Sequence, residues 1–93
     1  MAVLLVTYDL NREAGSKVDY NKFYKVRDTY DYVRLSESSY AFNTTESTDT
    51  VKAKIQGAFD ANDYVWIIPL KRPYSGYGLK TTIAWLDKNL PSS

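Results

Sequence analysis

Two segments of this chain are apolar at both alternating positions of an extended strand, and they constrain its fold more than any other feature. The first covers residues 2–9, Ala-Val-Leu-Leu-Val-Thr-Tyr-Asp, and the second covers residues 64–68, Tyr-Val-Trp-Ile-Ile. Successive side chains of a strand point to opposite faces of the sheet, so such runs predict strands that are buried on both faces. We therefore expect residues 2–9 to form a central strand.

Pro69 limits where the second of these strands can lie. Proline has no N–H group to donate to a neighbouring strand and is tolerated mainly at sheet edges. The sequence therefore predicts that the strand at 64–68 is an edge strand, or that its pairing stops at Pro69.

Two helices are predicted between these segments, from apolar residues that recur at helical spacing. Ser16 or Asp19 offers the N-cap of the first helix, and the polar stretch 44–49 offers several caps for the second. The repeating positions are Tyr20, Phe23, Val26 or Arg27, and Tyr30 in the first helix, and Val51, Ile55, Ala58 and Phe59 in the second.

The order of elements predicts an α+β class. Residues 32–36 and 39–43 are expected to be short strands joined by Glu37-Ser38, which produces two successive strand-helix-strand blocks. We expect one ferredoxin-like β-α-β-β-α-β domain over residues 1–93, with strand order 4-1-3-2. A short C-terminal helix is added, with Leu79, Ile83, Leu86 and Leu90 on one face.

Composition excludes several classes of chemistry. The chain has no cysteine and no histidine, which excludes disulfides, thiolate metal sites and the commonest general base. A formal net charge of +1 is not the electrostatic signature of a nucleic-acid binder by itself. The apolar N-terminal segment is too short for a signal peptide and lacks a basic leader, and no apolar run approaches the ~20 residues of a membrane span. We expect a soluble cytoplasmic protein.

The predicted architecture leaves one face of the sheet without a cover. Both main helices lie on the same side in a ferredoxin-like fold, whereas the first and last strands are apolar on both sides. An open apolar face of several hundred Å² is unusual on a monomer. A second copy of the chain, the C-terminal helix, or both must cover this face, and we expect a homodimer.

Several short motifs resemble a family of small bacterial and phage proteins. They are Val6-Thr7-Tyr8-Asp9-Leu10, Arg27-Asp-Thr-Tyr30, Ser39-Tyr40-Ala41-Phe42, the Pro-Tyr-Ser-Gly after the fourth strand, and Trp85-Leu-Asp-Lys-Asn-Leu90. The family is SinR-like and is related to the CRISPR-associated ferredoxin-like endonuclease, the partner subunit of the spacer integrase. The resemblance implies a face-to-face dimer, with Asp9 of each copy near the two-fold axis and one Mg²⁺ between them. The closing helix departs from the endonuclease, which tends to end in an extra strand.

Asp9 is the candidate catalytic and metal-binding residue. A carboxylate at the end of a buried strand can bind a hard cation, and two from a dimer can supply part of its oxygen shell. Tyr8 and Asn11 flank it and are weaker candidates for substrate contact. The alternative is that Asp9 caps or turns the following loop, as aspartate often does.

Basic and aromatic residues are candidates for DNA or RNA contacts. Basic side chains can contact phosphates, and tyrosines in the glycine loop can stack on bases. Each basic residue can equally belong to a solvated surface, and an aromatic loop can pack on the neighbouring helix. The segment 76–81 lacks the spacing of a phosphate-binding loop, so its glycines are better explained as turn residues with positive φ. The candidates are Arg27, Arg34, Lys71, Arg72, Tyr74 and Tyr77.

Two functions from different classes remain open. The first is a nucleic-acid-associated, endonuclease-like protein that uses Mg²⁺ at Asp9 for phosphodiester hydrolysis, or that binds without cleaving. The second is a non-catalytic dimeric interaction module, such as a phage or mobile-element accessory protein that binds a host protein or regulator.

Overall fold

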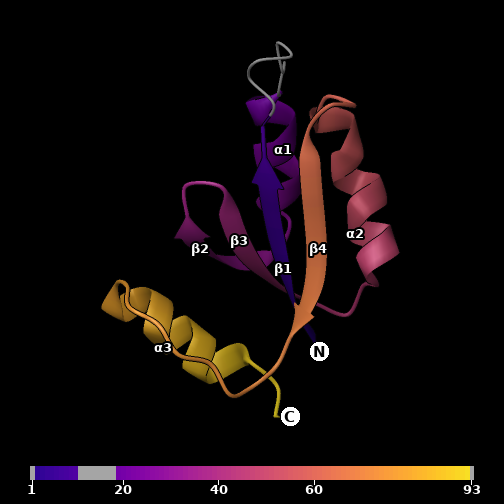
Figure 1. The fold of residues 1–93 in the computed structure, drawn as a ribbon. Coiled ribbons are helices and arrows are strands. Elements are labelled where there is room, and N and C mark those ends of the chain that lie inside the picture. Colours follow the sequence, from indigo (N-terminus) through magenta and orange to yellow (C-terminus); the bar gives the residue numbers. More distant parts are fainter. Residues whose placement is uncertain (1, 11–18, 93) are drawn as a thin grey trace.

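A computed structural model describes residues 2–10 and 19–92. Figure 1 shows a sheet with two helices on one side and a third helix lying apart from them. The elements in chain order are β1 (Ala2–Asp9), α1 (Tyr20–Arg27), β2 (Asp31–Ser36), β3 (Ser39–Thr44), α2 (Thr48–Ile55), the 3₁₀ turn η2 (Gln56–Ala58), β4 (Tyr64–Leu70) and α3 (Lys80–Asn89).

The four strands form one antiparallel sheet in the order β2-β3-β1-β4. The α+β class is confirmed, and this order is compatible with the ferredoxin-like class. β1 is central and β4 is an edge strand, as the sequence predicts. Pro69 lies inside β4, opposite Leu4, and the pairing continues to Leu70 opposite Val3. The alternative that pairing stops at Pro69 is therefore wrong, because an edge position already spares the missing N–H.

Side-chain caps fix the start of the two main helices. The Asp19 carboxylate accepts from the Lys22 backbone N–H at 3.0 Å at the start of α1. The Ser47 hydroxyl accepts from the Thr50 backbone N–H at 3.1 Å at the start of α2. Each bond satisfies an N–H that has no partner within the helix. Ser16, the other candidate cap, lies outside the described residues. Within the two described ranges, no helix is long and apolar enough to cross a membrane.

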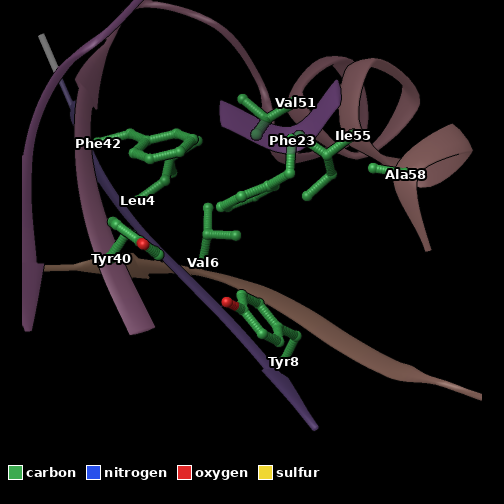
Figure 2. Packing of buried hydrophobic residues seen from close by; sticks show 9 residues of the cluster. All are labelled: Leu4, Val6, Tyr8, Phe23, Tyr40, Phe42, Val51, Ile55 and Ala58. Atoms are coloured by element: carbon green, nitrogen blue, oxygen red, sulfur yellow. The ribbon is translucent and has the colours of Figure 1, made fainter. Parts of the chain in front are cut away.

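The main core lies between the sheet and the pair α1 and α2 (Figure 2). β1 contributes alternate residues to this core, and Phe23 of α1 packs edge-on against Tyr8 with ring centroids 5.7 Å apart. The expected helix stripes are buried at Phe23, Val51 and Ile55. The cluster consists of Leu4, Val6, Tyr8, Phe23, Tyr40, Phe42, Val51, Ile55 and Ala58.

A second, smaller cluster lies on the opposite face of the sheet. Val3 and Ala41 are fully buried there against Leu86 and Leu90 of α3 and its end. The C-terminal helix therefore folds back onto the sheet, which is one of the covers that the sequence allows. The predicted apolar stripe of this helix is only half buried, because Leu79 is 73% exposed and Ile83 is 37% exposed.

Candidate functional site

The part of the sheet face that α3 leaves uncovered carries an apolar strip, which we call the open strip. It consists of Tyr64, Trp66 and Ile68 of β4, whose neighbours in register on β1 are Asp9, Thr7 and Leu5. Tyr64 and Trp66 are each 61% exposed and Ile68 is 47% exposed. The double burial predicted for residues 64–68 is thus wrong within one chain, because α3 covers only the end of the sheet near Val3.

Polar contacts hold α3 at that end of the sheet. The Trp85 indole N–H donates to the Asp31 carboxylate at 2.9 Å, and the Asn43 amide donates to the Asn89 side-chain oxygen at 3.0 Å. Both bonds join α3 to the β2–β3 end of the sheet. The boundary between the covered face and the open strip is therefore set by specific contacts.

Asp9 is the last residue of β1 and belongs to the same face as the open strip. It is exposed and lies opposite Tyr64 in the strand register. In the described part of the chain, no three Asp, Glu, His or Cys side chains come together to hold a metal ion. The predicted Mg²⁺ site draws Asp9 from two copies, so it stays a prediction. Asn11 and the loop that Asp9 was alternatively expected to cap lie outside the described residues.

A cavity of about 290 Å³ lies beside Asp9, at the end of β1 that faces α1. Tyr8 forms part of its wall, and its hydroxyl lies 3.5 Å from the Glu37 carbonyl oxygen, at the outer limit of a hydrogen bond. Burial, together with the neighbouring tyrosines, raises the pKa of Tyr8 to about 12. The phenol is therefore held in its neutral form and is a poor base. The lining residues are Tyr8, Asp9, Leu10, Tyr20, Tyr24, Arg34, Glu37 and Ser38.

Arg27, a candidate phosphate contact, lies against a group of tyrosine rings instead. Its guanidinium carbon is 4.4 Å from the ring centre of Tyr24 and 4.9 Å from that of Tyr32. It also donates to the Asp28 carboxylate at 2.9 Å. Cation–π contacts and a neighbouring carboxylate satisfy the charge, so this side chain is committed to the fold.

Arg34 lies on β2 and is exposed, which fits the solvated surface position that the sequence allows for it. It forms no ion pair with a carboxylate among residues 2–10 and 19–92. Its guanidinium donates to the carbonyl oxygens of Ser36 and Glu37 at 3.1 and 3.0 Å, and so bridges the turn between β2 and β3. Its charge remains near the surface, because neutral carbonyl groups do not cancel it.

The adjacent residues Lys71 and Arg72 lie in different environments. The Arg72 guanidinium donates to the carbonyl oxygens of Leu90, at 2.9 Å, and Asp87, which ties the start of the C-terminal segment to the end of α3. Cations near a helix C-terminus are favoured by the helix dipole. Lys71 is exposed and makes no ion pair with any residue in the described ranges.

The two loop tyrosines also differ. The Tyr74 hydroxyl donates to the Asp87 carboxylate at 2.7 Å, so this ring packs against α3 as the alternative to base stacking predicts. That bond raises the pKa of Tyr74. Tyr77 projects into solvent with its side chain fully exposed. Neither Gly76 nor Gly78 has a positive φ, so the prediction of left-handed turn glycines is wrong. Both have open space where a Cβ would lie, so a close approach does not explain them either.

The predicted site residues do not form one surface. Arg27 lies against the tyrosines at the end of α1, and Arg72 lies against the end of α3. The other four nucleic-acid candidates line one groove beside α3: Arg34, Lys71, Tyr74 and Tyr77. Only Asp9 lies next to the open strip. The sequence reasoning did not name Tyr64 and Trp66 as site residues, although their alternation with Val65 and Ile67 was the signal for a second apolar face.

No family model matches this chain, and no solved structure matches it.

Proposed function

We propose that this chain is a homodimeric interaction module of the ferredoxin-like class, in which the open strips of two copies pack against each other. The observation that carries the proposal is the pair Tyr64 and Trp66. They occupy alternate positions of the edge strand β4, so they lie on the same face of the sheet, and each is 61% exposed. Charged or polar residues normally occupy such positions in a monomer, because exposed apolar strands associate.

The size of the strip supports a second copy as its cover. An aromatic residue presents roughly 150–250 Å² for burial, so Tyr64 and Trp66, each 61% exposed, together expose roughly 180–300 Å² of mainly apolar surface, to which Ile68 adds. A standard interface buries about 800 Å² on each partner, with an apolar centre and a polar rim. The strip can supply the centre, and Leu5, Thr7 and Asp9 can supply part of its surroundings.

Sedimentation equilibrium tests this proposal. We expect the wild-type chain to reach twice 10.7 kDa at micromolar concentrations, and Trp66→Asp to remain at the monomer mass. Tyr20→Asp is the matched control, because Tyr20 is an exposed aromatic residue on the helix-covered side of the molecule. A wild-type mass that stays at 10.7 kDa at all concentrations overturns the proposal. Circular dichroism verifies that both variants fold.

A second function, nucleic-acid association with Mg²⁺-dependent phosphodiester hydrolysis, is favoured by the position of Asp9. Asp9 belongs to the face proposed for dimerisation, so two copies joined there can present two carboxylates to one cation. A bound Mg²⁺ would lower the pKa of an attacking water and stabilise charge on a phosphate. The scattered basic residues argue for weak, salt-sensitive binding, because few of them can act together.

Gel shifts of labelled DNA and RNA, with and without Mg²⁺, separate the two functions. For the nuclease we expect cleavage that depends on Mg²⁺ and is lost in Asp9→Asn, while sedimentation of the variant still shows a dimer. A dimer that neither shifts nor cleaves either nucleic acid retains the interaction module and excludes the second function.

A further inference from the structure

An apolar groove of about 470 Å³ lies between α3, the segment 70–79 and β2. Its walls include Leu70 at the end of β4, Leu35 of β2, and Ile83 and Leu86 of α3. This volume falls in the range of roughly 300–1,000 Å³ that is usual for small-molecule sites, which are mainly apolar with a few polar groups.

Specific contacts hold the walls of the groove in place. Arg72 bonds the carbonyl groups at the end of α3, and its own backbone N–H donates to the Pro91 carbonyl at 2.9 Å. Tyr74, itself a wall residue, is bonded to Asp87. The segment and the helix are therefore fastened to each other at Asp87 and at the end of α3, which holds the walls of the groove in place.

The charges of the groove are all of one sign. Its lining contains Arg34 and Lys71 and no Asp or Glu. The Arg34 guanidinium is engaged by two carbonyl oxygens, whereas Lys71 has no ion-pair partner among residues 2–10 and 19–92. The nearby Asp87 carboxylate already accepts from Tyr74. An apolar space with two cationic side chains, of which Lys71 is the one not held by the β2–β3 turn, favours a ligand that has an apolar body and a negative charge.

We propose that this groove binds a small amphipathic anion, such as an aliphatic or aromatic carboxylate, with its apolar body between α3 and β2 and its carboxylate at Lys71. The proposal does not depend on dimerisation, because the open strip lies outside the lining of the groove.

Isothermal titration calorimetry with decanoate tests the proposal, with decan-1-ol and decyltrimethylammonium as probes of the same chain length. We expect decanoate to bind the full chain about tenfold more tightly than decyltrimethylammonium, because the charge at Lys71 is attractive to one and repulsive to the other. Lys71→Glu should weaken decanoate binding by about tenfold and leave decan-1-ol within about twofold. Lys52→Glu, which changes an exposed lysine on α2, should leave the affinities for decanoate and decan-1-ol unchanged. Ile83→Glu, which changes a partly exposed residue of the groove wall, should weaken the binding of decanoate and of decan-1-ol.

Several results overturn the proposal. Absence of decanoate binding does so, and so does equal weakening by Lys71→Glu and Lys52→Glu. Amide chemical shifts that move at Trp66 and not along α3 would assign the binding to the open strip. Decanoate affinity that falls as the protein dimerises would show that a second copy occupies the groove instead.

Discussion

The same strands form both faces of the sheet, but the helices cover the two faces to different extents. On the face under α1 and α2, Val6 and Phe42 have no exposed surface, whereas on the other face Tyr64 and Trp66 are each 61% exposed. Two helices bury the centre of the first face, and α3 covers only one end of the second. The comparison teaches that a strand with apolar residues on both sides must be covered on both faces. In this chain α1 and α2 cover one face, and α3 covers part of the other.

Removing a large side chain from each face is the strongest test of this difference. Phe42→Ala should lower the free energy of unfolding by about 3–5 kcal/mol, because it deletes a ring that is fully enclosed and stacked on Tyr30 with ring centroids 4.7 Å apart. Trp66→Ala should change it by less than about 1 kcal/mol at concentrations where the chain is monomeric, because the ring is mostly in solvent. Urea denaturation at low protein concentration measures both.

The same pair of variants also reports on association. At high concentration, Trp66→Ala should lose the extra stability that wild type gains from dimerisation. Phe42→Ala, although less stable than wild type, should still become more stable as its concentration rises. Equal destabilisation by the two variants in the dilute monomer would contradict the contrast between the faces.

The partial cover provided by α3 is tested by Leu86→Ala. Leu86 is 9% exposed and belongs to the small cluster with Val3 and Ala41. We expect a loss of about 2–3 kcal/mol in the local stability of α3, at the low end for a buried leucine because the cluster is small. Amide hydrogen exchange should show α3 losing protection while β1 and β3 keep theirs. Loss of protection in α3 and the sheet together would show that the two clusters unfold as one unit.

Much of the fold could be predicted from the sequence, because it depends on local signals. The alternation of strands and helices, the cap at Asp19 and the edge position implied by Pro69 each reflect chemistry within a few residues. Leu79 was placed on one face with Leu86 and is 73% exposed, because helical spacing shows which residues share a face but not how far the neighbouring surface extends.

The candidate site was harder to predict, since it depends on which partners the basic side chains find. Arg27 meets three tyrosines from α1, β2 and β3, and Arg72 meets carbonyl groups of a helix that begins eight positions later. Neither contact has a sequence motif. The open strip did have one, the alternation within 64–68, but only the length and placement of α3 decide how much of that face stays exposed.

Alkaline titration sharpens the comparison at the edge of the covered face. The raised pKa of Tyr8 means that the folded state holds the phenol proton more tightly than the unfolded chain does, whose tyrosine titrates near 10. This contribution to stability is fully present below about pH 10 and is lost as pH rises from 10 to about 12. Tyr8→Phe should therefore show a shallower fall in the free energy of unfolding over that window. Tyr77→Phe, at a fully exposed position outside the open strip, is the control and should follow wild type.

The smallest effect on stability is expected at Tyr30, whose hydroxyl is buried under the covered face. The Tyr30 ring stacks on Phe42, and its hydroxyl is buried without a hydrogen-bond partner of acceptable geometry among the described residues. Burial and the nearby Glu46 carboxylate both raise the pKa of this phenol. A buried hydroxyl that is poorly paired costs desolvation and returns little, so Tyr30→Phe should leave stability unchanged or raise it by up to about 1 kcal/mol. Tyr32→Phe on the adjacent strand, in a half-buried ring that also contacts Phe42, is the matched control. A loss of more than about 1 kcal/mol in Tyr30→Phe alone, measured by urea denaturation at neutral pH, would show that the hydroxyl is well bonded in solution.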